Sequence, residues 1–562
     1  MTKKDALNAL SQTADLLELL GSNDFRAAAY RKSERLLERW EGNWDAAIDD
    51  GFKDAPGVGV QTGRSLVQYA QTGVFQPLEE LRVQVPSSVV DLFRVRGLGP
   101  KKIRALWDAG VDSIPALVAS AKAGELSAFK GFGKSTQDKL LEAAQFVLNT
   151  GERWRLHAAE AALLKLSATL EGIAQVHAAG SYRRGFETIG DLDAVAVGDE
   201  AAIRAALEPF GVAPDAIYDW LLTATLEGVT LQLAIATPDT LGAALLVMTG
   251  SKAYLERVMT ATSERGLELS SRGLTRASLI VPTLTERAAF TALELPYIIP
   301  EWREAEHDTV TLPDSADLVT LGDVRGMLHV HTTYSDGAHS VLEMALAAQK
   351  LGMTHLGICD HSQSAFYAGG LTPARVRQQW LEIDAVNADL QDFRILKGIE
   401  SDILGDGSLD YDPDLLGGFD FVVASVHSKF DLSEADQTNR LIKAVQNPFT
   451  TILGHPTGRL LLRRPSYKLN IPAVLEAARD AGAVVEINAS PYRLDLDWRE
   501  VLRAQDQWYA VNTDAHHTSG YDDLKYGVRS ARKGAVTKRR FINALSPSEF
   551  LEFARAKRER SS

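Results

Sequence analysis

The sequence is poor in cysteine, with Cys359 as the only one among 562 residues. A single cysteine excludes an intramolecular disulfide framework and favours a reducing compartment. The first residues lack the apolar core of a signal peptide, and no run of about 18 or more apolar residues is present that could cross a membrane. The sequence therefore predicts a cytoplasmic protein with no membrane segment.

An excess of positive charge is also absent. Sixty lysines and arginines stand against 74 acidic residues, which leaves a net charge of −14. This balance argues against nucleic-acid binding through bulk charge, but it leaves room for local basic faces and for backbone amides that contact phosphate. The length predicts about three to five domains, and 45% hydrophobic residues are typical of a globular protein.

The N-terminal third contains the same glycine turn three times, each between short segments with helical periodicity. Two glycines allow a tight turn that exposes backbone N–H groups at a helix N-terminus, where a phosphate binds without sequence readout. The pattern indicates a helix-hairpin-helix, although ordinary helix turns are the alternative. The residues expected to bind DNA are Gly57, Gly59, Gly97, Gly99, Lys101, Lys102, Gly131, Gly133 and Lys134.

A second motif pairs a Gly-Ser turn with an Asp-x-Asp strand. Gly180 and Ser181 open a predicted helix close to arginines, which suits a triphosphate. Asp191 and Asp193 share one face of a strand and could bind a divalent metal; a solvated aspartate pair is the alternative. The residues expected to bind nucleotide are Gly180, Ser181, Arg184 and Gly190.

These motifs, together with Thr249-Gly250-Ser251-Lys252, make residues 1–310 similar to a family X DNA polymerase of the nucleotidyltransferase superfamily. The resemblance implies that the Gly-Ser turn holds the phosphates of a dNTP. It also implies that Asp191 and Asp193 are catalytic and hold Mg²⁺ or Mn²⁺ together with a third carboxylate.

The sequence departs from that family where the third carboxylate should stand. Gln232 occupies the position, and a glutamine carries no charge and cannot act as a base. Glu227 is five residues away, so on a strand it would face the other side. Residues 61–72 also lack the lysine that lyase-active relatives use. We therefore expect no lyase activity and a polymerase activity that is weak or lost.

The C-terminal region concentrates the histidines, since nine of twelve lie at or after His329. His329 and His331 share one face of a predicted strand. Short β-like runs then alternate with helical segments, which suggests an α/β barrel whose strand ends converge on one mouth. Each candidate ligand lies in or shortly after an apolar run: His329, His331, Asp336, His361, Glu400, His427, His455, Asp514 and His516.

This region resembles the PHP (polymerase and histidinol phosphatase) domain, a metal-dependent phosphoesterase. The resemblance implies three divalent ions, Mn²⁺ or Zn²⁺, which would supply a nucleophile at neutral pH and stabilise phosphate charge. The implied sets are His329, His331, Glu400 and Asp514 for one ion, Glu400, His427 and His455 for another, and Asp336, His361 and His516 for the third.

The expected fold is multidomain, combining α+β and α/β parts. The expected domains are a helical DNA-binding domain (1–88), a second helix-hairpin-helix region (89–150), a nucleotidyltransferase palm (151–240), a thumb (241–312), a linker (313–325) and a PHP domain with a distorted (β/α)7-like barrel (326–562).

The leading functional hypothesis is a DNA-repair protein, of the base-excision type, that acts as a metal-dependent 3′–5′ exonuclease on gapped or primer–template DNA. We expect it to work as a monomer. The alternatives are a functional gap-filling polymerase that uses Asp191 and Asp193, a non-enzymatic scaffold for DNA ends, and a small-molecule phosphatase. The three hairpin turns argue against the last, because a small ester needs no module for holding a duplex.

Overall fold

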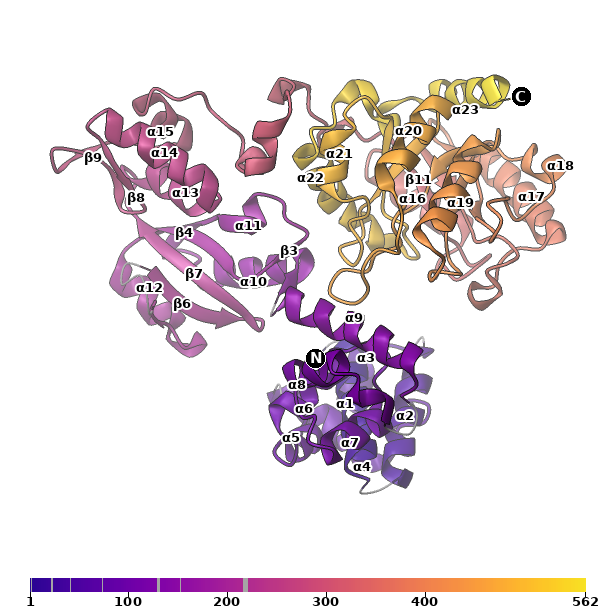
Figure 1. Cartoon of the computed structure of the whole chain (residues 1–562), viewed down its shortest axis with the longest axis horizontal. Coiled ribbons are helices and arrows are strands. Elements are labelled where there is room, and N and C mark those ends of the chain that lie inside the picture. The colour runs from indigo at the N-terminus through magenta and orange to yellow at the C-terminus, as the bar shows by residue number, and fades with distance from the viewer. Residues whose placement is uncertain are drawn as a thin grey trace. The chain divides into compact units, whose positions relative to one another are not determined.

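The computed structural model describes the chain except residues 2, 22–23, 41, 73, 129–131, 152, 216–220 and 562 (Figure 1). It forms two compact units, Met1–Gly151 with Leu462–Arg464, and Glu152–Leu461 with Pro465–Ser562. Within the described residues, no helix is long and apolar enough to cross a membrane. The finer boundaries predicted from the sequence stay predictions.

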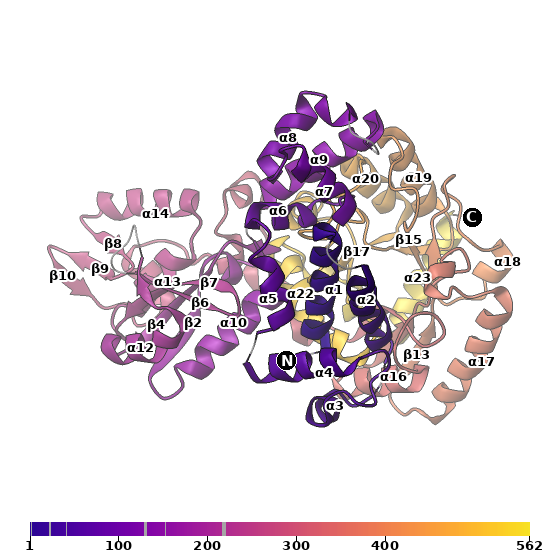
Figure 2. The same ribbon diagram turned by 90° about the horizontal axis from the view of Figure 1, so that it is seen from below.

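In its described residues, Met1–Gly151 of the first unit consists of helices joined by turns and loops. Helices α1 and α2 pack against each other along their lengths (Figures 1 and 2). Their apolar faces meet those of the later helices in one core that includes Leu10, Leu37 and Ile103. The helices are α1 (Lys3–Leu20), α2 (Asp24–Glu38), α3 (Trp44–Asp50), α4 (Val60–Thr72), α5 (Gln76–Arg82), α6 (Ser87–Asp91), α7 (Pro100–Asp108), α8 (Ile114–Lys122) and α9 (Lys134–Thr150).

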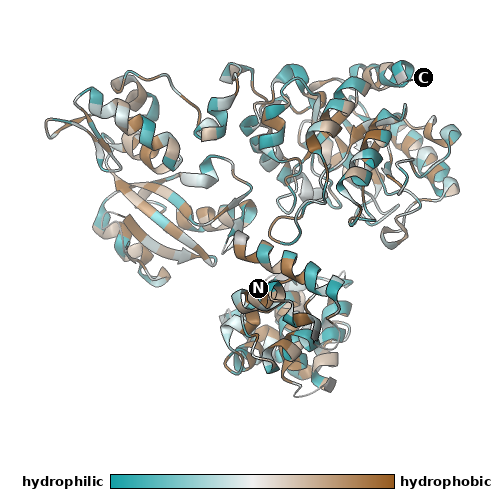
Figure 3. Ribbon diagram, viewed as in Figure 1, coloured by the Kyte–Doolittle hydropathy of each residue, from teal (hydrophilic) through white to brown (hydrophobic). Residues whose placement is uncertain are grey.

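The second unit begins with a mixed five-stranded sheet, called the palm sheet below, in the order β2-β4-β7-β6-β5. Strands β4 and β7 are parallel and the other neighbours are antiparallel. Figure 3 shows its strands coloured mainly as hydrophobic. The strands are β2 (Ala174–Ala178), β4 (Leu192–Gly198), β5 (Ala213–Pro214), β6 (Leu221–Leu226) and β7 (Val229–Ala236).

The two faces of the palm sheet bury different side chains. Alternation along β4 sends Leu192 and Ala194 toward α10 (Leu156–Thr169) and α12 (Glu200–Leu207). Val195 points the other way and joins the cluster that includes residues of α13 (Leu241–Thr249). Asp193 shares the face of Val195, so the Asp-x-Asp carboxylates lie on the α13 side of the sheet.

The palm sheet is followed by a smaller region. A three-stranded sheet in the order β10-β9-β8 accompanies helices α14 and α15 around Leu246, Leu274 and Phe290. The elements are α14 (Lys252–Glu264), β8 (Glu268–Ser270), β9 (Gly273–Arg276), β10 (Leu279–Val281) and α15 (Glu286–Ala292).

The C-terminal part is a parallel α/β barrel, built from a three-stranded sheet (β11-β12-β13) and a five-stranded sheet (β14 to β18 in order). Single bridges between His361 and Glu400 and between Val330 and Ala515 join the two sheets. The strands are β11 (Gly326–Val330), β12 (His355–Ile358), β13 (Arg394–Lys397), β14 (Glu400–Asp402), β15 (Val422–Ser425), β16 (Thr450–Leu453), β17 (Val484–Asn488) and β18 (Tyr509–Asn512).

The barrel strands are buried on both faces, which explains their nearly continuous apolar sequence. Helices cover the outside of the barrel (Figure 1). They are α16 (Val341–Lys350), α17 (Pro373–Asp389), α18 (Pro413–Leu416), α19 (Glu434–Gln446), α20 (Ile471–Ala481), α21 (Trp498–Arg503), α22 (Leu524–Lys533) and α23 (Pro547–Ser561). The predicted mixed multidomain fold with a C-terminal α/β barrel is confirmed.

Helix α22 connects the barrel to the Gly-Ser turn. Lys533 is buried and donates hydrogen bonds from Nζ to the carbonyls of Arg184 at 3.0 Å and Glu301 at 3.2 Å. Its own carbonyl lies 2.7 Å from Nε2 of His307, whose ring stacks on Trp498 with a centroid separation of 5.2 Å. Residues 305–309, which precede the barrel, are therefore anchored to α22 and Trp498 through the buried side chain of His307.

We expect this junction to open in mild acid. Burial lowers the pKa of His307 to about 4, whereas an unfolded histidine titrates near 6.5. Between these two pH values, His307 binds a proton only when the segment is open. The stability of the junction therefore falls as the pH drops from about 6.5 to about 4, by up to about 3 kcal/mol in total. Hydrogen exchange of residues 305–309, corrected for intrinsic rates, measures the loss of protection.

His307→Gln is the matched variant, because its amide can still donate to the Lys533 carbonyl but does not titrate. It should keep a nearly constant exchange protection over the same pH range, with strand β7 as an internal reference. Equal acid sensitivity in the variant and the wild type would contradict the role assigned to His307.

Candidate functional site

The nine side chains predicted as metal ligands meet at one end of the barrel. His329 lies within β11 and Glu400 begins β14, while the other ligands follow the ends of β11, β12, β15, β16 and β18. Because all barrel strands are parallel, these positions share one mouth. Four groups form in which one donor atom from each member lies within 4.8 Å of the others: His331, Asp336, His361 and His516; His329, Glu400 and His455; His329, His331 and Asp514; His361, Glu400 and His427.

Glu400 lies at the centre of the cluster and is fully buried. Its carboxylate oxygens are 2.8 to 3.7 Å from imidazole nitrogens of His361, His455, His427, His329 and His331. Burial would raise the pKa of Glu400, but attraction to the surrounding imidazoles outweighs it and holds the pKa well below its usual range. The carboxylate is therefore charged and surrounded by imidazole nitrogens.

The grouping differs from the sets expected from the sequence, and His455 groups with His329 and Glu400 while His427 groups with His361 and Glu400. His331 lies close to the Asp336 group as well as to His329 and Asp514. His361 lies 2.8 Å from Glu400 as well as 3.6 Å from Asp336. The ligand sets therefore overlap more than expected, and the division of the nine residues among ions stays a prediction.

The donor set fits divalent cations. Among the described residues, His329 Nε2, His331 Nδ1 and Glu400 Oε2 are buried without a hydrogen-bond partner, and burying such atoms unpaired is costly. Burial, with the neighbouring His516 and His361, lowers the pKa of His331 to about 3. This imidazole is therefore neutral, which is the form that binds metal.

Two carboxylates that we did not predict support the ligand histidines. Glu486 Oε2 lies 2.7 Å from Nδ1 of His329, and Asp402 Oδ1 lies 2.7 Å from Nδ1 of His427. A carboxylate behind a ligating histidine fixes its ring and its tautomer. Both residues had a sequence signal, since Glu486 interrupts the apolar run of β17 and Asp402 is two residues after Glu400 on the same strand.

Asp360 is a third unpredicted carboxylate near the cluster. It is buried and accepts hydrogen bonds from Thr332 N at 2.8 Å, Ser335 N at 3.1 Å and Gln379 Nε2 at 2.6 Å. These bonds tie the loop that carries Asp336 to α17. The carboxylate next to His361 in sequence therefore positions the loop.

Arg493 brings positive charge to the same mouth, with its Nε 3.8 Å from Asp514 Oδ2. Arg459 does not, because its guanidinium pairs with Asp497 at 2.8 Å and donates to the carbonyl of Arg493 at 3.0 Å. Arg493 is therefore the better candidate to meet a substrate phosphate.

In the palm sheet, Gln232 occupies the place of the expected third carboxylate, directly beside Asp191 and Asp193. Gln232 is the register partner of Asp193 across the parallel strands β4 and β7, so both side chains share one face. Burial and the neighbouring Asp191 raise the pKa of Asp193 to about 7. Glu227 is exposed in the turn before β7, with a φ of 50°, and does not reach this face.

The Gly-Ser turn packs tightly on the same carboxylate. Gly180 has a φ of 58°, and an added Cβ would lie 1.7 Å from Asp193 Oδ2, so only glycine fits. Ser181 follows in α11 (Gly180–Arg183), and Gly190 precedes Asp191. Arg184, whose predicted role in nucleotide binding stays a prediction, pairs with Glu304 at 2.5 Å and donates to the Thr249 carbonyl at 2.8 Å.

The glycine turns of the first unit have the geometry expected for phosphate contacts. Gly57 and Gly97 have positive φ values of 74° and 92°. An added Cβ on Gly59, Gly99 or Gly133 would meet no atom within 4 Å. The helices that begin next are α4, α7 and α9, so open backbone adjoins each helix start.

The predicted lysines flank two of these turns. Lys101 and Lys134 are exposed, and Lys102 Nζ donates to the Gly97 carbonyl at 3.0 Å. Gly131 lies outside the described residues. The arrangement suits phosphate contacts at the second and third turns.

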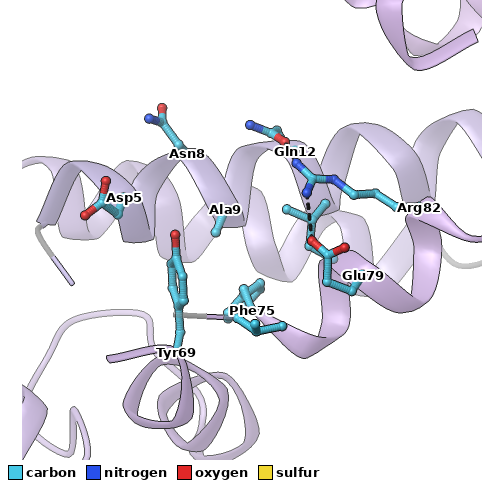
Figure 4. Close-up of a pocket in the computed structure, with 10 residues that line it drawn as sticks. Asp5, Asn8, Ala9, Gln12, Tyr69, Phe75, Glu79 and Arg82 are labelled. Carbon is cyan, nitrogen blue, oxygen red and sulfur yellow. Dashed lines mark hydrogen bonds and ion pairs between the residues drawn. The ribbon is translucent and has the colours of Figure 1, made fainter. Parts of the chain in front are cut away.

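A cavity of about 390 Å³ also opens in the first unit (Figure 4). Asp5, Glu79 and Arg82 contribute its charged side chains, and Arg82 Nη1 already pairs with Glu79 at 2.7 Å. Because Arg82 is already paired, the cavity does not favour a phosphate ligand, which binds best to unpaired cations. The expected absence of lyase activity stays a prediction.

Three family models match parts of the chain. A "DNA polymerase beta thumb" model matches residues 244–304, a "SAM-like Helix-hairpin-helix tandem" model matches residues 89–145, and a "PHP domain" model matches residues 327–490. Along the chain, the helix-hairpin-helix match comes first, the thumb match second and the PHP match third, which is the order predicted from the motifs.

Individual relatives cover different shares of the chain. A "DNA polymerase/3'-5' exonuclease PolX" of Bacillus subtilis (strain 168) is 36% identical over 565 aligned residues, which cover 97% of this chain and 98% of that protein. A "Probable phosphatase" of Caldanaerobacter subterraneus subsp. tengcongensis is 32% identical over 175 residues, covering 29% of this chain and 62% of the relative. Another, of Thermoanaerobacter sp. (strain X514), is 27% identical over 229 residues, covering 38% and 88%.

Proposed function

This chain belongs to the family of the DNA polymerase/3'-5' exonuclease PolX, and from that membership we propose how its two catalytic regions divide the work. The C-terminal barrel is a metal-dependent 3′–5′ exonuclease that acts in DNA repair. The polymerase-like core binds the DNA and extends it weakly or not at all. The observation that carries this proposal is the contrast between nine assembled metal donors and a palm triad that has Gln232 in place of a carboxylate.

The barrel would hold up to three ions, Mn²⁺ or Zn²⁺, on the nine predicted ligands. Such ions supply a nucleophile at neutral pH and neutralise charge on the phosphate. The chain's own residues then have two tasks. The carboxylates of Glu486 and Asp402 orient the rings of His329 and His427, and Arg493 attracts the phosphate that is to be cleaved.

The glycine turns of the first unit supply the contacts to the DNA backbone. Open N–H groups at helix starts, with lysines beside two of them, suit phosphates of any sequence. We therefore propose gapped or primer–template DNA with a 3′ end as the substrate, bound by a monomer. A phosphatase that acts on small esters has no use for these turns.

A gap-filling polymerase is the second candidate, because Gly180 of the Gly-Ser turn packs directly against the carboxylate of Asp193. The proposed phosphate site and the proposed metal site are therefore adjacent. In that case Asp191 and Asp193 would hold Mg²⁺ or Mn²⁺, and a dNTP would bind at the Gly-Ser turn. Its triphosphate would have to compete with Glu304 for Arg184.

One assay separates these functions. Purified protein is stripped with EDTA, analysed for metal, and given a gapped DNA with labelled primer, with Mn²⁺ or Zn²⁺ and with or without dNTPs. We expect shortening of the primer from its 3′ end only when metal is restored, and little extension. Metal-independent shortening, or extension that outpaces shortening at equal metal, would overturn the proposal.

A further inference from the structure

Two exposed aromatic rings lie beside the metal ligands, in the loop between β12 and α17. Phe366 is 85% exposed and Tyr367 is 64% exposed. The ring centroid of Tyr367 is 6.3 Å from that of the ligand His361, and the Phe366 and Tyr367 centroids are also 6.3 Å apart. The two rings therefore continue from the metal cluster onto the surface.

The loop that presents these rings is firmly anchored. The flanking Ala365 and Leu371 are fully buried. Ser364 N donates to Asp410 Oδ2 at 2.6 Å, and Arg375 Nη1 donates to the Gly369 carbonyl at 2.8 Å. The exposure of the rings is thus imposed by a well-packed backbone and does not result from a loose loop.

The position of the rings is also selective. Among the described residues, the exposed aromatic side chains are Phe25, Phe366, Tyr367 and Tyr492. Three of these four lie in segments that follow barrel strands at the metal-bearing mouth. A single exposed ring needs no explanation, but two adjacent rings on a rigid loop at a catalytic cluster mark a binding surface.

We propose that Phe366 and Tyr367 form a stacking platform for the last bases of an unpaired DNA 3′ strand. This inference rests on the proposed exonuclease function and adds the form of its substrate. Aromatic rings stack on any base, because every base has a π-face, and each stacked base contributes about 1–3 kcal/mol. A paired terminal base is held by its complement and by its neighbour, so the platform favours frayed or single-stranded ends.

The platform places the last phosphodiester between the rings and Arg493. Arg493 approaches the cluster from the loop after β17, whereas the rings come from the loop after β12. The rings lie beside the ligand His361 and Arg493 lies beside the ligand Asp514, so base and phosphate are held by two different loops. The role proposed for both rings is to hold the terminal bases, so both residues are positioning residues.

The test uses the full-length protein with Mn²⁺ and two single strands of equal length. One carries normal bases, and the other carries tetrahydrofuran in place of its last three bases. The double variant Phe366→Ala/Tyr367→Ala should lose about 10- to 100-fold in kcat/KM on the normal strand. It should equal the wild type on the baseless strand, because no base is there to stack.

Two further variants serve as controls. The pair Phe366→Trp/Tyr367→Phe keeps both rings and should act like the wild type. Leu381→Ala removes a side chain that is 72% exposed on α17 and should change neither rate. The platform would be overturned if the double alanine variant lost kcat/KM equally on both strands, or lost it on neither.

Binding without cleavage gives an independent readout. With EDTA present, a 2-aminopurine at the 3′ end should lose fluorescence on binding wild-type protein and should lose less with the double alanine variant. If the wild type cleaves neither strand with Mn²⁺, the exonuclease proposal fails. The fluorescence change then still decides whether the rings stack the base, and its absence would overturn the inference by itself.

Discussion

His331→Ala is expected to lower the nuclease rate by about 10³-fold or more. His331 donates to two of the four ligand groups, one with Asp336, His361 and His516, and one with His329 and Asp514. Its removal takes a nitrogen from both groups at once, and alanine leaves a buried gap that cannot bind metal. The primer-shortening rate at saturating Mn²⁺ and the bound metal per chain measure the effect.

Two variants calibrate this loss. Glu486→Gln keeps every direct ligand but removes the charge behind His329, so metal affinity should fall by about 10- to 100-fold and excess metal should restore activity. His339→Ala, on the loop after Asp336 and outside the four groups, should retain wild-type activity. Nuclease activity that persists in His331→Ala would mean that the barrel is not the nuclease.

Gln232→Asp is expected to raise primer extension by about 10²- to 10⁴-fold, the range that a general base contributes. Gln232 is the register partner of Asp193, so an aspartate there joins Asp191 and Asp193 on one face of the palm sheet. It supplies the third oxygen donor and a group that can take the proton of the primer hydroxyl. Single-nucleotide extension on a gapped template with Mg²⁺ is the measurement, made in the His331→Ala background to suppress shortening.

The third carboxylate carries a cost without metal. Burial and Asp191 already raise the pKa of Asp193 to about 7, and another nearby negative charge raises it further. Thermal unfolding of Gln232→Asp should therefore shift upward on addition of Mg²⁺ more than that of the wild type. Gln232→Asn is the neutral control of the same size as aspartate, and Asp191→Ala in the Gln232→Asp protein should abolish extension. No gain in extension would show that Gln232 is not what limits the palm.

Local sequence rules predicted the parts of this protein that depend on neighbours in the chain. Positive φ values at Gly57 and Gly97 follow from a turn that only glycine forms easily. The shared face of Asp191 and Asp193 follows from strand alternation. The substitution at Gln232 was visible because the resemblance to family X DNA polymerases implies a carboxylate at that position of β7.

The second layer of the metal cluster was harder to see. Glu486 and Asp402 each lie within a buried strand, and a carboxylate in such a strand signals a partner without naming it. The partners, His329 and His427, are 157 and 25 residues away in the chain. Likewise, the loop that exposes Phe366 and Tyr367 is held by Asp410 and Arg375, and no periodicity in the sequence reports those contacts.

The sequence by itself determined where the glycine turns lie and which residue types are available to bind metal, since these depend on residue type and spacing. Its resemblance to family X DNA polymerases indicated that the palm lacks a carboxylate. Only the tertiary structure decided which ligands approach one another, how Glu400 joins two groups, and that Arg184 is held by Glu304. The physical reason is that barrel closure brings together strand ends far apart in the chain. The distances between their side chains come from packing, which a linear pattern does not contain.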